Sequence, residues 1–333
     1  MLSPPPGFSN LNRQPNGFDN EPSSAKAALE RKREVKWQKM ARPIKSSSGG
    51  GTIYTFDTSN AKLISRAWKG IPDRWRATAW HSFLSTSASR HRNAPSDATL
   101  VSAFHRVQFL DCPDDVQIDM DVPRTIGEHI MFRRRYRGGQ RLLFRVLRAL
   151  ALHFPGTGYV QGMAPLAATL LCYYDEEMAF VMSVRLWMLR GIGELYRPGF
   201  EGLMGALEVF EKRWIGGRAV GEQLDALGIA STAYGTKWYL TLFNYSIPFQ
   251  AQLRVWDVFM LLGDGDGAEG EGSGNLDVLH ATSAALLDGL QEMLLDSDFE
   301  TAMKMLTSSV PLGREDVLMR VAKKEWKERK RRT

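Results

Sequence analysis

Apolar residues recur at intervals of three and four through most of the chain beyond Lys62, which is the spacing of amphipathic helices rather than of strands. The pattern is clearest over residues 140–154, where one helical face carries Leu143, Val146, Leu147, Leu150 and Phe154. Similar stripes span residues 75–84, 178–188, 200–214, 279–295 and 299–306. We therefore predict an all-α domain over residues 61–312, made of two helical subdomains that form one groove.

The pattern weakens on both sides of this domain. Residues 1–22 are rich in Pro, Asn, Gly and Ser without an apolar period, which is typical of a disordered leader with no role in stability. Residues 23–60 are expected to form a basic helix ending near Arg42, followed by a Ser/Gly linker at 46–51. Residues 313–333 are expected to form a basic C-terminal helix or tail.

Residues 263–274 interrupt the helical pattern with six glycines and four acidic residues. No side chain in this stretch is suited to a core, so we interpret it as a flexible surface insertion that is dispensable for stability. Three of its glycines, Gly265, Gly267 and Gly270, match G-x-G-x-x-G. The acidic residues between them would repel a phosphate, so we assign no nucleotide site here.

Composition narrows the class of protein. The 333 residues are 44% hydrophobic, which is enough for a substantial core. Two cysteines, Cys112 and Cys172, are too few for a disulfide scaffold or a Cys-based zinc site, and we expect both to be thiols in a reducing cytosol. The first residues lack the features of a signal peptide, and the longest strongly apolar run, residues 164–174, is too short to cross a membrane.

The net charge of +6 is located in residues 320–333, which hold eight Lys or Arg and two Glu. Such a run attracts anionic lipid, nucleic acid or an acidic partner without much specificity. A solvated helix end is the simplest interpretation. As a hypothesis, this basic tail makes weak contact with anionic membrane.

The sequence lacks the usual signatures of a self-contained hydrolase or kinase, such as G-x-S-x-G, H-E-x-x-H and a GK[ST] phosphate loop. Polar residues instead crowd together among apolar ones at residues 118–125. There Pro123 restricts the backbone before Arg124, so that the guanidinium is displayed from a loop or helix start. Asp121 lies three residues earlier and can pair with Arg124. An ordinary surface ion pair with a capping Thr125 is the alternative.

A second polar position lies in Gly158-Tyr-Val-Gln161-Gly-Met, just after a turn that ends the preceding helix. Pro165 favours a new helix whose first turn begins at residues 162–165. Gln161 therefore lies at the mouth of a helix, where an exposed amide can orient a water molecule. A helix cap or a buried hydrogen bond would explain the same residue.

These segments resemble the paired finger motifs of the TBC-domain Rab GTPase-activating family: Ile118-x-x-Asp121-x-x-Arg124, and 35 residues later Tyr159-x-Gln161-Gly162-Met. Further matches follow in the order of the family. Gly70-Ile-Pro-x-x-x-Arg76-x-x-x-Trp80 resembles its first motif, in which the Arg76 cation is expected to stack on the Trp80 ring. Its late block is matched by residues 238–243, Pro248, Arg254, Trp256 and Asp257.

The resemblance is strongest to the RN-tre-like branch of the family. Residues 128–133, Arg135 with Tyr136, and the upstream residues 36–40 look like segments of that branch. Ala164 departs from the small polar residue usual after Gln-Gly-Met, and the Gly/acidic stretch is an insertion. Neither departure changes a finger residue, so we expect both to affect which Rab is recognised rather than the activity.

The resemblance implies a GTPase-activating protein for a Rab-type small GTPase in its GTP-bound state. Arg124 would be the arginine finger and Gln161 the glutamine finger, with Asp121 orienting Arg124 and with Thr125, Tyr159 and Gly162 in support. The protein would need no cofactor or metal of its own, because GTP and Mg²⁺ are carried by the Rab. The family also implies vesicle traffic and a cytoplasmic protein recruited to endosomal or Golgi membranes.

Two other functions fit parts of the sequence. A catalytically silent TBC scaffold would bind a Rab or another protein, although loss of a finger would have indicated it and both fingers are present. A nucleic-acid binder is suggested by the seven arginines and absence of acidic residues between Arg133 and Arg148. Apolar residues of a core stripe interleave with those arginines, so we expect no nucleic-acid partner.

Overall fold

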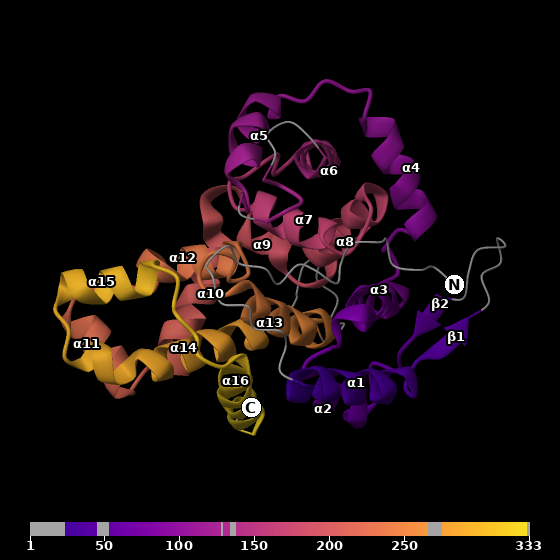
Figure 1. Cartoon of the computed structure of the whole chain (residues 1–333). Helices are drawn as coiled ribbons and strands as arrows, with labels where there is room; N and C mark the ends of the chain where they lie inside the picture. The colour runs from indigo at the N-terminus through magenta and orange to yellow at the C-terminus, as the bar shows by residue number, and fades with distance from the viewer. Residues whose placement is uncertain (1–23, 45–52, 128, 134–137, 266–274, 332–333) are drawn as a thin grey trace.

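Helices make up nearly every regular element of the protein (Figure 1). The computed structural model describes residues 24–44, 53–127, 129–133, 138–265 and 275–331. The first elements are α1 (Ser24–Gln38), β1 (Arg42–Ile44), β2 (Ile53–Thr55), α2 (Ala61–Ala67), α3 (Asp73–Arg90), α4 (Asp97–Val107), α5 (Asp115–Asp121) and the 3₁₀ turn η2 (Val122–Arg124). The middle elements are α6 (Gly139–His153), α7 (Met163–Leu171), α8 (Glu176–Leu189), α9 (Ile192–Leu195), η3 (Pro198–Phe200), α10 (Glu201–Phe210) and the π turn η4 (Glu211–Ile215). The last are α11 (Ala219–Ala226), α12 (Thr232–Leu240), α13 (Phe249–Leu262), α14 (Asp277–Leu295), α15 (Phe299–Thr307) and α16 (Glu315–Lys330).

The predicted all-α fold is confirmed, and each predicted apolar stripe coincides with a helix. Several helices begin at a side chain that caps their free amides, because Asn, Ser and Asp oxygens accept these hydrogen bonds well. Asn60 caps α2, Ser96 caps α4, Asp175 caps α8 and Asp298 caps α15. None of the helices in the described ranges is long and apolar enough to span a membrane.

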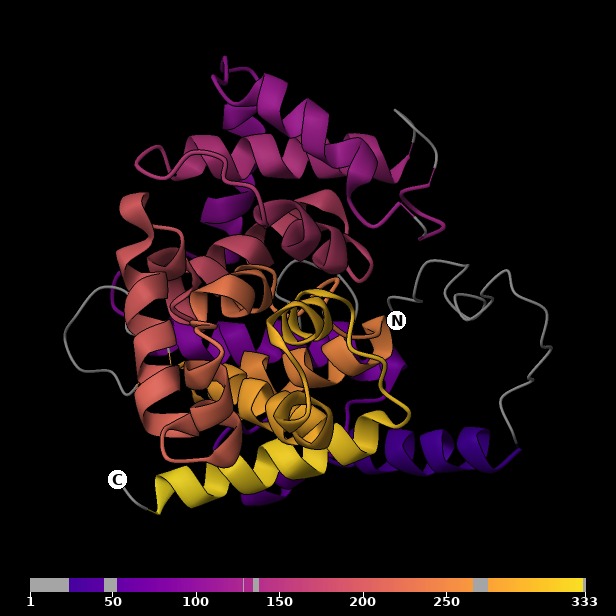
Figure 2. The same ribbon diagram turned by 90° about the vertical axis from the view of Figure 1, so that its left-hand side faces the viewer.

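Two buried helices organise the packing. Every residue of α7 is buried, and α7 contacts α6 and α8 in the first half of the domain. Helix α13 is buried along most of its length and contacts α2, α3, α14 and α16. A helix that buries residues on all its faces requires neighbours on every side. Figures 1 and 2 show the helices in two groups, α4–α8, which includes α7, and α10–α16, which includes α13.

The segment before α2 contains a hairpin that the sequence did not predict. Strand β1 pairs antiparallel with β2, with Arg42 opposite Thr55, while the predicted Ser/Gly linker lies within residues 45–52, outside the described residues. Trp37 of α1 and Phe56 are both buried, and their rings meet edge to face at 5.3 Å. This segment therefore contributes to the hydrophobic core.

The basic C-terminal segment forms the predicted helix, α16, as far as Lys330. Its buried face, including Leu318, Met319 and Ala322, packs against α14. Trp326 meets Trp68 at 5.8 Å between ring centroids. The basic side chains of α16 are thus held on a docked helix.

Asp264, in the stretch expected to place no side chain in a core, forms ion pairs with the folded body. Its carboxylate lies 3.4 Å from the Arg190 guanidinium, which is 1% exposed, and 3.6 Å from Arg90. Burial, which disfavours the charged form, lowers the pKa of Arg190 to about 10 despite this carboxylate. A deletion that includes Asp264 would leave that buried cation without its counterion. Residues 266–274, like the leader 1–22, lie outside the described residues.

The first motif and the late block meet at one buried carboxylate, that of Asp257 on α13. It accepts hydrogen bonds from the Ile71 amide at 2.9 Å, from Arg76 Nε at 2.9 Å and from Trp80 Nε1 at 3.0 Å. The predicted stacking of Arg76 on Trp80 is wrong, because both side chains turn towards Asp257, and the Arg76 guanidinium lies over the Tyr173 ring instead. Burial opposes the charge on Arg76, but Asp257, Tyr173 and Asp73 together outweigh burial and raise the Arg76 pKa above its usual range.

Two other residues of these motifs have structural roles. Gly70 adopts φ +98°, and a Cβ there would lie 2.5 Å from Nε of Arg254. A side chain at position 70 would therefore be strained and would displace Arg254. Trp256 donates from Nε1 to the Leu242 carbonyl at 3.0 Å and packs against Trp80. The motif residues thus hold α2, α3 and α13 together.

We expect Asp257→Asn to destabilise the fold by about 3–5 kcal/mol, because it removes the buried carboxylate from the Arg76 guanidinium, whose other ion pair is with the largely exposed Asp73. Urea unfolding followed by circular dichroism measures the change. Asp296→Asn, an exposed site at the end of α14, is the matched control and should stay within about 0.5 kcal/mol of the parent. Equal stability of Asp257→Asn and the parent would contradict this assignment.

Candidate functional site

Arg124 is displayed as predicted, at the end of the 3₁₀ turn η2 that follows α5. Its side chain is 57% exposed, whereas the side chain of Asp121 is 4% exposed. Nη2 of Arg124 donates to Oδ1 of Asp121, so one edge of the guanidinium is held. The outward part remains available to a partner.

The second carboxylate oxygen of Asp121, Oδ2, binds the segment that contains Tyr159 and Gln161. Tyr159 donates its hydroxyl to Oδ2 of Asp121 at 2.6 Å, in a buried hydrogen bond between residues 38 apart in the sequence. Burial raises the pKa of Tyr159, and Asp121 raises it further, so the phenol stays protonated and remains a donor. One carboxylate therefore fixes both the arginine and the segment that carries Gln161.

Gln161 lies just before α7, as the sequence predicted, with an exposed side chain. Among the described residues, its amide forms no hydrogen bond, so it is free to meet a partner. The backbone turns at Gly162, whose φ is +112° and where a Cβ would lie 2.9 Å from the Tyr196 hydroxyl. Glycine at position 162 therefore permits the turn that presents Gln161.

Two residues that sequence reasoning missed complete the site. Asp114 accepts the Tyr159 amide on Oδ2 at 2.8 Å, although from the sequence it resembles an N-cap of α5. The Tyr245 hydroxyl accepts the Ile126 amide at 3.1 Å. Asp114 sits next to a recognisable helix start, but no local signal marks Tyr245.

The backbone after Arg124 is strained. Thr125 donates its hydroxyl to the Asp121 carbonyl at 2.8 Å, and Ile126 then adopts φ +44°, which a β-branched residue rarely does. Tyr245 itself has φ +63° and lies in a turn where Leu242 and Phe243 also have positive φ. Strain of this kind persists only where surrounding contacts impose it. The bond between Ile126 and Tyr245 thus joins the arginine segment to the second half of the domain.

Exposed apolar side chains flank the arginine segment. Val116 is 74% and Met120 61% exposed, and their four-residue spacing puts them on one face of α5. Phe109, in the connection from α4, is 89% exposed.

Arg148 anchors this region from α6, donating to Asp115 at 2.9 Å and to the Leu110 carbonyl. Because Arg148 forms internal contacts, it is not available to nucleic acid as part of the arginine cluster between Arg133 and Arg148. Residues 134–137 of that cluster lie outside the described residues.

The site offers hydrogen-bond donors rather than a nucleophile. An exposed guanidinium and an exposed amide are presented from two segments tied to the same carboxylate. Within the described part of the chain, no group of three His, Cys, Asp or Glu is placed to hold a metal ion. The chemistry open to such a site is to contact an anion and a water molecule that a partner brings. The fold and site together define a helical domain that exposes a guanidinium and an amide on its surface.

Comparison with known proteins identifies that domain. The profile of the Rab-GTPase-TBC domain matches residues 73–295. A TBC domain-containing protein of Schizosaccharomyces pombe is 43% identical over 293 residues, which are 88% of this chain and 67% of that protein. The chain belongs to the Rab-GTPase-TBC domain family.

Two mammalian relatives fit the RN-tre-like branch that the motifs indicated. Mouse carabin is 31% identical over 242 residues, covering 70% of this chain and 50% of carabin. Human TBC1 domain family member 10B is 30% identical over 247 residues, covering 72% of this chain and 28% of that protein. The chain thus spans half or less of the length of these two relatives.

Solved structures support the fold independently of sequence identity. The Ypt/Rab-GAP domain of Gyp1p superposes with a TM-score of 0.68 at 15% identity, over 91% of this chain and 99% of that domain. A Chlamydomonas flagellar RabGAP TBC domain gives 0.65 at 22% identity, over 92% and 97% respectively. At these identities the likeness shows the shared all-helical fold alone.

We expect Tyr159→Phe to lower the free energy of unfolding by about 1.5–3 kcal/mol, because it removes a buried hydrogen bond to a charged acceptor. Chemical denaturation measures the effect. Tyr54→Phe is the control, since the Tyr54 hydroxyl forms no hydrogen bond within the described residues. If both variants lose the same stability, the bond to Asp121 does not stabilise the fold.

Proposed function

We propose that this protein accelerates hydrolysis of GTP bound to a Rab-type small GTPase, with Arg124 as the arginine finger and Gln161 as the glutamine finger. The observation that carries the proposal is the buried Asp121, which binds Arg124 and also Tyr159, two residues before Gln161. Membership of the Rab-GTPase-TBC domain family supports a Rab as the partner. By the same analogy, we extend the proposal to vesicle traffic and to a cytoplasmic protein recruited to endosomal or Golgi membranes.

Arg124 would act on charge that develops on the transferred phosphoryl group. An arginine supplied in trans accelerates GTP hydrolysis by about 10³ to 10⁵, or roughly 4–7 kcal/mol of barrier. The pair with Asp121 orients the guanidinium before the partner arrives, so less conformational entropy is lost on binding. Asp121 is therefore a positioning residue and Arg124 the group that meets the substrate.

Gln161 would position the attacking water. Its exposed amide at the start of α7 has both a donor and an acceptor free for this purpose. Tyr159 and Gly162 support it, the first through Asp121 and the second by allowing the turn. The nucleotide and its Mg²⁺ belong to the Rab, which is bound in the GTP state.

The exposed apolar residues Val116 and Met120 are proposed to contact the Rab. They lie on the helix that leads into Arg124, and contact with a partner would remove their exposed apolar surface from water. Burying them would anchor the partner beside the arginine. This contact would add binding energy without taking part in the reaction.

We expect Arg124→Lys to be nearly as damaging as Arg124→Ala, because lysine keeps the charge but loses the planar fork that reaches two oxygens. Single-turnover phosphate release from a panel of GTP-loaded Rabs measures the effect, which should reach about 10³-fold or more. Gln161→Ala should also reduce turnover sharply. The double variant should lose less than the product of the two single losses, since both residues serve one transition state.

Arg213→Ala, at an exposed arginine in the second half of the domain, is the matched control and should retain parental turnover. Binding to the GTP-bound Rab should weaken little in the finger variants, whereas binding to a Rab with GDP and a metal fluoride should weaken most. If Arg124→Ala and Gln161→Ala kept parental turnover on a Rab that the parent accelerates, the finger assignment would fail. A parent that binds Rabs without accelerating any of them would instead be a silent scaffold.

We expect Val116→Ser with Met120→Ser to raise KM about tenfold or more and to leave kcat unchanged, because buried apolar side chains each contribute on the order of 1.5 kcal/mol or more. The matched control is Met204→Ser with Val209→Ser, which makes the same two substitutions at exposed residues of α10. An equal KM for both double variants would show that the exposed face of α5 does not contact the Rab.

A further inference from the structure

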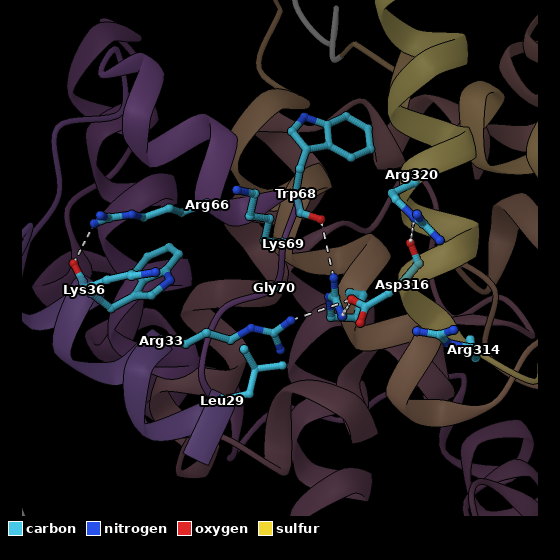
Figure 3. Close-up of a pocket in the computed structure, with 12 residues that line it drawn as sticks. Leu29, Arg33, Lys36, Arg66, Trp68, Lys69, Gly70, Arg314, Asp316 and Arg320 are labelled. Carbon is cyan, nitrogen blue, oxygen red and sulfur yellow. Dashed lines mark hydrogen bonds and ion pairs between the residues drawn. The ribbon is translucent and has the colours of Figure 1, made fainter. Parts of the chain in front are cut away.

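A cavity of about 540 Å³ lies between α1, the end of α2 and α16, and it is strongly basic (Figure 3). Seven of its twelve lining residues are Lys or Arg, and the one acidic residue is Asp316. Its walls come from segments that are far apart in the sequence, from Leu29 to Arg320. Figures 1 and 2 show α1 and α16 along the same edge of the molecule. None of the finger residues lines this cavity.

The positive charge of the cavity is only partly neutralised. Asp316 is shared by Arg254 at 2.9 Å and Arg33 at 3.7 Å. Across the described ranges, no carboxylate lies within 4.0 Å of the other five basic residues, which are Lys36, Arg66, Lys69, Arg314 and Arg320. Bringing like charges into one concave surface strengthens the local positive potential, and an anion bound there would relieve it.

The neighbouring face of α16 extends the positive region. Partial burial lowers the pKa of Lys323, and the charges of Lys327 and Lys69 lower it further. Lys69 follows α2 and therefore lies near α16 in space. The positive charge therefore continues from the cavity residue Lys69 to Lys323 and Lys327 of α16.

The cavity is preformed by buried side chains. Trp37 is 1% and Trp68 3% exposed, and Trp68 also packs against Trp326 of α16. Arg66 donates from Nη1 to the Lys36 carbonyl at 2.8 Å, which fixes its guanidinium between α1 and α2. Rigid walls lower the entropic cost of binding a small ligand.

We infer that this cavity binds a small, multiply phosphorylated anion of the inositol phosphate class, either free or as the headgroup of a lipid. In Figure 3, Arg33 and Arg66 lie on one side of the cavity and Arg314 and Arg320 on the other, with Arg33 turned towards Asp316 and Arg66 towards the Lys36 carbonyl. Guanidinium groups match phosphate oxygens in pairs, and the volume falls within the roughly 300–1,000 Å³ typical of ligand pockets. An extended acidic peptide would need cations along a groove, whereas these seven line one cavity.

The test is calorimetric titration of the full chain with inositol trisphosphate. Lys69→Glu with Arg320→Glu changes two exposed cavity residues, and we expect about a hundredfold loss of affinity, since each charge-assisted contact is worth about tenfold. The matched control is Lys62→Glu with Lys324→Glu, which makes the same charge change on or beside the same helices, outside the cavity. This control should bind as the parent does, and unfolding curves should coincide for all three proteins.

A second arm identifies the source of the phosphates. Cosedimentation with phosphatidylcholine vesicles containing phosphatidylinositol bisphosphate, compared with phosphatidylserine vesicles of equal charge, should depend on Lys69 and Arg320 if a lipid headgroup is bound. Binding of inositol trisphosphate without this vesicle dependence supports a soluble anion. The proposal is overturned if neither probe binds, if the cavity variant binds both as the parent does, or if polyglutamate binds more tightly than inositol trisphosphate.

Discussion

A carboxylate that is buried away from water must be surrounded by hydrogen-bond donors. At Asp257 this requirement brings together segments that are far apart in the sequence. Its donors come from the loop before α3 and from α3 itself, while Asp257 lies on the buried helix α13. Because α13 also contacts α2, α14 and α16, fixing it against α3 fixes elements from both halves of the domain. Removing one partner would expose the other to the full cost of a buried charge.

The same kind of interaction recurs at Asp121 with a different result. At Asp257 the paired Arg76 is buried, so the ion pair serves the fold. At Asp121 the carboxylate is buried but more than half of the Arg124 side chain is exposed, so the pair orients a side chain that can still meet a partner. The hydroxyl of Tyr159 completes the coordination of Asp121 and brings the Gln161 segment into the same arrangement.

The basic cavity is connected to the structural centre through the late motif. Arg254 lies one turn before Asp257 on α13, lines the cavity and is held by Asp316 of α16. Gly70, whose lack of a side chain admits Arg254, lines the same cavity. Residues that stabilise the fold therefore also shape the surface on which a second ligand is proposed to bind.

Local pattern determined the helices, the order of the motifs and the i,i+3 pairing of Asp121 with Arg124, because each depends on residues close together in the sequence. The exposure of Gln161 before α7 followed from the turn and Pro165 in the same way. Only the tertiary structure decided that Tyr245 holds the backbone after Arg124, that an acidic residue of the Gly-rich stretch neutralises a buried arginine, and that α1 and α16 enclose a basic cavity. These contacts join residues more than 70 positions apart, and helical periodicity fixes which face of a helix is buried but not which distant side chain it meets.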